Sequence, residues 1–114
     1  MNNKPFSRVE RVEKQLLKVV NELILHEIDI RKLGFITFSS VKVTSDLKHA
    51  NIFFSVINPS KAAESIANHL NELVPLFRKS LSRTIKLKTV PTLKFFYDDS
   101  FEQFQKINEL MKKI

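Results

Sequence analysis

Hydrophobic residues follow a helical spacing in the first part of the chain. From Val9 to Leu23 they recur every three or four positions, which is the spacing of one face of an α-helix. Ser7 and Glu10 stand where a capping box would satisfy the free N–H groups of a helix start. The pattern therefore predicts an amphipathic helix that runs to about Glu27.

A glycine separates this helix from two stretches of alternating apolar and polar residues. Gly34 is a predicted turn, and residues 35–44 and 51–57 are rich in β-branched and aromatic side chains. The short segment between them favours an antiparallel hairpin. The alternation slips at Ser39 and Ser40, which indicates a β-bulge there.

The second half of the chain contains a helical pattern that a proline interrupts. Asn58 is the predicted N-cap and Pro59 the first helical residue. Proline is tolerated there because the first N–H groups of a helix have no intrahelical acceptor. A proline inside a helix removes a hydrogen bond and clashes with the preceding turn. A kink or break is therefore expected at Pro75, with helical spacing resuming beyond it.

A third strand and a short helix complete the pattern. Residues 93–97 alternate as a strand, and Ser100 with Gln103 predicts a second capping box for a helix to about Lys113. The order is helix, strand, strand, helix–kink–helix, strand, short helix. It predicts a single α+β domain over residues 1–114.

The charge balance favours a polyanionic partner. The chain of 114 residues carries 19 Lys and Arg against 12 Asp and Glu, a formal net charge of +7. Such an excess indicates nucleic acid first and a membrane surface second, although charge alone can also serve solubility. Ten phenylalanines against one tyrosine and no tryptophan indicate that the aromatic side chains mostly fill a core.

Several classes of site are excluded by missing residue types. Without cysteine there is no disulfide scaffold, thiolate zinc site or cysteine nucleophile. With one glycine the chain cannot build a Rossmann turn, a P-loop or an EF-hand loop. No apolar run approaches the roughly 20 residues of a membrane span, and the N-terminus does not resemble a targeting signal. We therefore expect a cytoplasmic protein that does not associate with membranes.

The remaining candidates for chemistry are weak. Asp98 and Asp99 precede a predicted helix, where adjacent carboxylates are more often caps than metal ligands. His26, His49 and His69 lie in different elements without ligand spacing. We therefore predict no metal, no cofactor, no small-molecule substrate and no catalysis.

The positive charge is concentrated after the proline. No acidic residue lies between Leu73 and Tyr97. In a helix, Lys79, Arg83 and Lys86 would be spaced i, i+4, i+7 and share one face opposite the apolar stripe. Such a row can match the phosphates of a nucleic-acid strand, with an affinity that falls steeply as salt rises.

An ordered set of motifs carries a resemblance to a known family. The motifs are Arg8–Val12, Val41–Leu47 followed by Ala50, Phe77–Arg78, Ile85–Phe95 and Tyr97–Ser100. The set resembles ribosome-binding factor A of bacteria over nearly the whole chain, in one register.

The resemblance implies a KH-like domain of the type II order. Members have a helix–kink–helix in place of the GXXG loop with which KH domains hold nucleic-acid backbone. They usually carry a small residue and a glycine at the kink, where this chain has Leu73, Val74 and Pro75. Proline can bend the chain but does not allow the same close approach of backbone to RNA. Lys86 and Lys88 stand where the family tends to have arginine.

The resemblance also implies a function in ribosome biogenesis. Members are non-catalytic late assembly factors that bind rRNA near the neck of the immature small ribosomal subunit. They support rRNA end processing, particularly at low temperature. We expect a monomer whose RNA-binding residues are Arg78, Lys79, Arg83, Lys86 and Lys88, with Arg8, Arg11 and Lys14 in second rank. The alternative is a basic adaptor module that docks an acidic protein.

Overall fold

The computed structural model describes residues 7–112, and its elements follow the predicted order. They are α1 (Arg8–His26), the 3-10 turn η1 (Arg31–Leu33), β1 (Phe35–Val43), β2 (His49–Ile57), α2 (Ala63–Glu72), α3 (Val74–Thr84), β3 (Thr92–Tyr97) and α4 (Ser100–Lys112). The predicted α+β class is confirmed. The chain ends that were included in the expected single domain lie outside the described residues.

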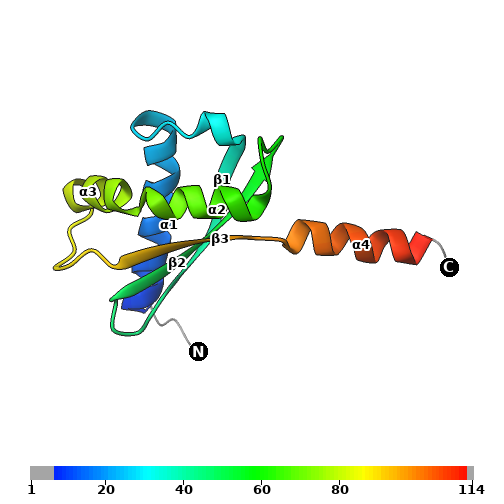
Figure 1. The fold of residues 1–114 in the computed structure, drawn as a ribbon. Coiled ribbons are helices and arrows are strands. Elements are labelled where there is room, and N and C mark those ends of the chain that lie inside the picture. Colours follow the sequence, from blue (N-terminus) through cyan, green and yellow to red (C-terminus); the bar gives the residue numbers. More distant parts are fainter. Residues whose placement is uncertain (1–6, 113–114) are drawn as a thin grey trace, which may run out of the picture.

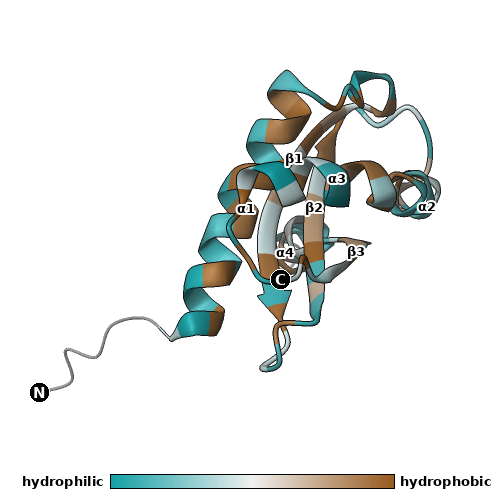
Figure 2. Ribbon diagram, turned by 90° about the vertical axis from the view of Figure 1, so that its left-hand side faces the viewer, coloured by the Kyte–Doolittle hydropathy of each residue, from teal (hydrophilic) through white to brown (hydrophobic). Residues whose placement is uncertain are grey.

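Helix α1 forms as its sequence predicts. The Ser7 hydroxyl accepts a hydrogen bond from the backbone N–H of Glu10 at 3.2 Å, which caps the helix start. The helix then alternates between hydrophilic and hydrophobic bands (Figure 2), because every turn contributes residues to both faces. Its apolar face is buried, and the buried residues are Val12, Leu16, Val19, Val20 and Leu23.

The sheet has the strand order β1-β2-β3. Strands β1 and β2 are antiparallel, and β2 and β3 are parallel. The register of the hairpin shifts between Phe38 and Ser40, which confirms the predicted bulge. Buried and exposed residues alternate along the strands, so helices cover one face of the sheet and leave the other to solvent.

Three aromatic rings join the sheet to the helix after the kink. Phe38 of β1, Phe77 of α3 and Phe95 of β3 are buried, and their ring centroids lie 5.0–6.0 Å apart. Rings at this separation attract one another in tilted and edge-to-face arrangements. This cluster fixes α3 against the sheet.

Two asparagines on the covering helices each bond to one of the two edge strands of the sheet. The Asn21 side chain of α1 donates to the carbonyl of Phe38 at 3.0 Å and accepts from the N–H of Phe38 at 2.9 Å. Asn71 of α2 makes the same pair of bonds with Phe95 of β3, at 3.0 and 2.8 Å. Each asparagine thereby satisfies an edge N–H and C=O that the ladder leaves unpaired.

The predicted start of the second helix is wrong. Helix α2 begins at Ala63, and Asn58 instead takes a left-handed φ of 52°. The carbonyl of Asn58 packs so close to Gly34 that a Cβ there would lie 2.8 Å away, and Gly34 itself has φ 125°. The N–H of Ser60 donates to the carbonyl of Leu33 at 3.0 Å. The segment is therefore tied across the turn before β1 and is not free to begin a helix.

The kink is confirmed at the predicted residues. Helix α2 ends at Glu72, Leu73 serves as the cap between the two helices, and α3 begins at Val74. Pro75 lies in the first turn of α3, where no intrahelical acceptor faces its missing N–H. The bend therefore breaks the pattern into two helices.

The C-terminal helix begins differently from the prediction. The Ser100 hydroxyl donates to Asp98 at 2.6 Å and does not take part in a box with Gln103, whose N–H donates to the carbonyl of Asp99. Helix α4 projects away from the sheet (Figure 1). Its large apolar side chains are exposed at Phe104, Ile107, Leu110 and Met111.

The phenylalanines are less uniformly buried than their number indicates. Among those whose burial is described, Phe35 and Phe104 are exposed, and Phe53 and Phe96 are half-buried. The last two stand on the sheet face that no helix covers. They are therefore available to a partner.

Candidate nucleic-acid interface

Helix α3 presents part of the predicted basic row. Lys79 and Arg83 are exposed on it, opposite the buried Phe77. The helix ends at Thr84, and Ile85 takes an extended conformation with its side chain in the core. The prediction that Lys86 continues the helical row is therefore wrong.

The loop after α3 carries two more predicted lysines. Residues 85–91 connect α3 to β3, and both Lys86 and Lys88 are exposed there. Any phosphate contacts by these lysines would therefore come from a loop. The distance between the two side chains is then not fixed by helical geometry.

A pocket of about 480 Å³ gathers basic side chains from separate parts of the chain. It lies between the start of α1, the β1–β2 hairpin, α3 and the loop before β3. Its basic lining residues are Arg8, Lys48, His49, Arg78 and Lys88. Among the described residues that line it, Asp46 is the only acid. The pocket thus unites one second-rank predicted residue, Arg8, with Arg78 and Lys88.

Arg78 is held in place at this pocket. Its Nη2 donates to the carbonyl of Val90 at 3.0 Å, which fixes the guanidinium against the loop. Its Nε is buried and has no hydrogen-bond partner among the described residues. The buried Nε is closed to a ligand, but a guanidinium carries five N–H donors, and those left on its two terminal nitrogens suit a phosphate oxygen.

The hairpin positions the basic residues that sequence reasoning missed. Asp46 accepts hydrogen bonds from the Thr44 hydroxyl at 2.6 Å and the N–H of Lys48 at 3.0 Å, which lower the pKa of this carboxyl. Leu47 has a left-handed φ of 62°. This turn directs Lys48 and His49 to the pocket. The signal available in the sequence was a turn motif followed directly by two basic side chains.

The other predicted residues lie outside the pocket lining. Arg11 and Lys14 are exposed on the turns of α1 that follow Arg8, and Lys79, Arg83 and Lys86 lie outside the pocket. The candidate interface is therefore a pocket flanked by basic surface on α1 and α3. We call the five basic lining residues the basic pocket.

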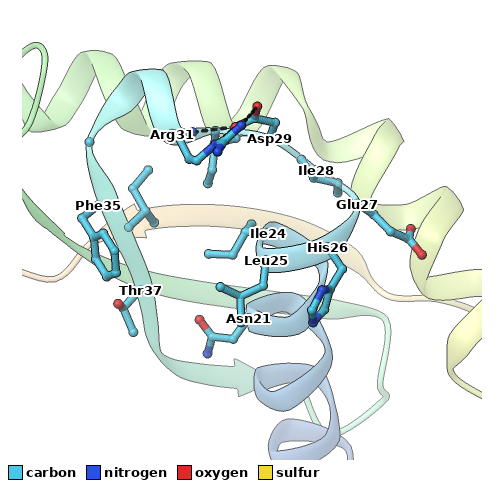
Figure 3. A pocket seen from close by; sticks show the side chains of 13 residues that line it. Asn21, Ile24, Leu25, His26, Glu27, Ile28, Asp29, Arg31, Phe35 and Thr37 are labelled. Atoms are coloured by element: carbon cyan, nitrogen blue, oxygen red, sulfur yellow. Dashed lines mark hydrogen bonds and ion pairs between the residues drawn. The ribbon is translucent and has the colours of Figure 1, made fainter.

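A second pocket, of about 560 Å³, lies at the opposite end of α1. Figure 3 shows Ile24 and Leu25 at the end of the helix, near the strand that carries Phe35. Leu25 and Phe35 are 74% and 71% exposed. On the rim, Asp29 and Arg31 form a two-pronged ion pair at 2.9 Å, and the hydrogen bonds from Arg31 lower the pKa of Asp29 to about 2. Because these charges satisfy each other, the pocket does not concentrate positive charge.

Within residues 7–112, no three His, Asp or Glu side chains come together as a possible metal site. None of the helices in the same range is both long and apolar enough to cross a membrane.

Comparison with solved structures supports the fold. The chain is similar to the crystal structure of ribosome-binding factor A from Thermus thermophilus, with a TM-score of 0.67, 20% identity and coverage of 80% of this chain and 97% of that one. A Thermotoga maritima solution structure gives a TM-score of 0.66 at 23% identity and covers 83% of this chain and 91% of that one. A third similar chain, with a TM-score of 0.64, 18% identity and coverage of 78% and 93%, is a Thermus thermophilus homology model fitted into the map of a complex of the factor with the 30S subunit.

Sequence comparison identifies the family. Residues 8–111 match the family model described as ribosome-binding factor A. A protein of that name from Legionella pneumophila is 40% identical over 100% of this chain and 91% of its own length. One from Geobacter metallireducens is 32% identical over 96% of this chain and 92% of its own length. Matches of this extent leave no large part of either protein unaligned, and the chain belongs to the ribosome-binding factor A family.

Proposed function

We propose that this protein is a non-catalytic assembly factor that binds rRNA in the immature small ribosomal subunit. The observation that carries the proposal is the basic pocket, where Arg8, Arg78 and Lys88 converge from distant parts of the chain. Phosphate is the ligand that such a cluster suits, because each contact neutralises one phosphate and releases counterions. The Thermus thermophilus homology model fitted into a 30S complex supports the small subunit as the partner.

The proposed action is a shift of the rRNA equilibrium. A factor without catalytic groups changes an RNA arrangement only by binding one state better than another. It should therefore prefer immature particles to mature ones and leave when the RNA reaches its final form. Late maturation and rRNA end processing would follow from the arrangement that it favours.

Co-sedimentation with separated ribosomal particles tests the proposal. We expect salt-sensitive retention of the protein on free small subunits, stronger on immature than on mature particles. Arg8→Glu with Lys88→Glu should remove that retention, because it places two negative charges at the pocket. The matched control is Lys61→Glu with Lys112→Glu, which makes the same change of net charge at exposed positions outside the pocket.

The outcomes separate RNA binding from the adaptor alternative. Retention of the wild type on no ribosomal particle, even at low salt, would refute the proposed function. Equal loss in the pocket variant and the control would show that only net charge matters. Binding to an acidic protein but not to purified small-subunit rRNA would favour the adaptor.

A further inference from the structure

The face of the sheet that no helix covers carries an ordered set of side chains. Strand register aligns Lys42 of β1, Asn51 of β2 and Lys94 of β3 in one row across the sheet. All three are exposed. Neighbouring strands lie about 4.8 Å apart, so the two lysines stand on backbones separated by roughly 10 Å.

The next row of the same face is aromatic. Register aligns Ser40, Phe53 and Phe96. The rings of Phe53 and Phe96 are stacked, with centroids 5.6 Å apart and planes inclined by 26°, and both side chains are only half-buried. Lys94 places its Nζ 5.2 Å from the centroid of the Phe96 ring. The stacked rings of Phe53 and Phe96 thus lie beside the row that carries the exposed Lys42 and Lys94.

This face is continuous with the basic pocket. His49 and Thr92 are register partners in the row that precedes Lys42–Asn51–Lys94, and both also line the pocket. Along β2, His49, Asn51 and Phe53 point to the same side, because side chains alternate along a strand. A chain leaving the pocket along β2 would reach Phe53 after about 13 Å, at about 3.3 Å per residue.

We propose that this sheet face binds unpaired nucleotides of RNA, with bases stacked on Phe53 and Phe96 and phosphates paired with Lys42 and Lys94. The inference rests on the proposed function and assigns it a second surface, for single-stranded RNA. Three features select this occupant: no acid lies in these rows, the rings offer exposed π surface, and the face continues from a pocket suited to phosphate. Bases in a duplex are already stacked on each other, so only unpaired bases can use the rings.

The test measures the affinity of the full chain for two labelled RNAs by fluorescence anisotropy. One probe is a short oligouridine, which stays single-stranded, and the other is a perfect duplex of equal length. The first variant is Phe53→Leu with Phe96→Leu, which keeps apolar bulk but removes the rings. The second is Lys42→Gln with Lys94→Gln, and its matched control is Lys61→Gln with Lys112→Gln, at exposed positions away from this face.

We expect the ring variant to bind oligouridine at least about fivefold more weakly, since stacking one base on an aromatic ring contributes about 1 kcal/mol or more. Its affinity for the duplex should stay within about twofold of the wild type. The Lys42/Lys94 variant should also weaken oligouridine binding and flatten its salt dependence more than its control does. A thermal melt establishes that each variant is folded, and the lysine pair changes exposed side chains only.

Three results would overturn the inference. The first is wild-type affinity for oligouridine in both face variants while Arg8→Glu with Lys88→Glu loses RNA binding, which leaves the proposed function standing. The second is an equal loss by the ring variant on both RNAs, because a duplex cannot use the rings. The third is loss of binding to polyglutamate in the face variants with oligouridine binding intact, which would make the face a protein contact. A wild type that binds neither RNA would refute the proposed function itself.

Discussion

At the scale of single residues, Tyr97 reports on the junction between β3 and α4. Its hydroxyl donates to Glu102 at 2.6 Å, and this bond, with partial burial and the nearby carboxylates, raises its pKa to about 12. The chain has one tyrosine and no tryptophan. Ultraviolet absorbance at alkaline pH therefore follows this side chain alone.

Glu102→Gln should return the pKa of Tyr97 toward its ordinary value of 10.0. A phenol whose pKa is higher in the folded state than in the unfolded state stabilises the fold fully below pH 10. That contribution is lost as pH rises from about 10 through about 12. Spectrophotometric titration measures the shift, and Glu109→Gln, at an exposed position of the same helix, is the control. An identical titration curve for Glu102→Gln and the wild type would contradict the hydrogen bond.

Single residues also show where sequence reasoning stops. Gly34 was predicted as a turn from its type alone, and its φ of 125° confirms it. Asn58 was predicted as a helix cap but takes a left-handed turn. Asparagine suits both roles because its short amide can bond to nearby backbone in either conformation. The choice depends on Gly34, which lies 24 positions earlier and allows the carbonyl of Asn58 to approach.

At the scale of elements, the stability of β3 depends on a helix that does not precede it directly. Asn71 lies on α2, separated from β3 by the whole of α3, and makes both edge hydrogen bonds of Phe95. It also donates to the carbonyl of Ala67 at 2.9 Å within its own helix. One amide thus couples two elements that are not neighbours in the chain.

Asn71→Ala should lower the free energy of unfolding by roughly 2 kcal/mol, because it leaves the N–H and C=O of Phe95 without partners at a partly buried edge. Urea unfolding followed by circular dichroism measures the change. Asn68→Ala makes the same substitution at an exposed position of the same helix and should change stability by less than about 0.5 kcal/mol. Equal effects of the two substitutions would mean that the edge bonds contribute little.

Elements were easier to predict than their ends. Periodicity and capping signals predicted the four α-helices and three strands, most of which pack an apolar face into the core, but not the 3-10 turn η1. The ends depend on contacts between elements, and those contacts placed the start of α2 at Ala63 and the end of α3 at Thr84. The second shift matters for the proposed interface, since it moves Lys86 from a helical row into a loop.

At the scale of the whole molecule, positive charge gathers in places that the sequence shows only in part. The acid-free stretch around α3 was visible as a run of residues. The contribution of Lys48 and His49 was not, because only the packed hairpin brings them to Arg8 and Arg78. The rows on the open sheet face also require the register of three strands, which spacing within one strand cannot supply.

Arg83→Glu with Lys86→Glu tests whether binding extends beyond the basic pocket. Both side chains are exposed and lie outside the pocket lining. We expect the double variant to lose retention on immature small subunits at physiological salt while keeping the thermal stability of the wild type. Reversing two charges on a polyanion-binding surface replaces attraction with repulsion. Co-sedimentation unchanged from the wild type would restrict the interface to the pocket.

The closed edges of the sheet restrict how this protein can meet others. Many proteins recruit an extended peptide by adding it as a further strand, and the same open edges let copies of one chain join into ribbons. Here the N–H groups of Phe38 and Val43 on β1 already donate to the side chains of Asn21 and Glu13. On β3, the N–H of Phe95 already donates to the side chain of Asn71. An incoming strand would have to displace these side chains to pair at Phe38 and Val43 of β1 or at Phe95 of β3. Recognition is left to faces and side chains, and a small three-stranded sheet can remain among crowded neighbours without becoming a template for their strands.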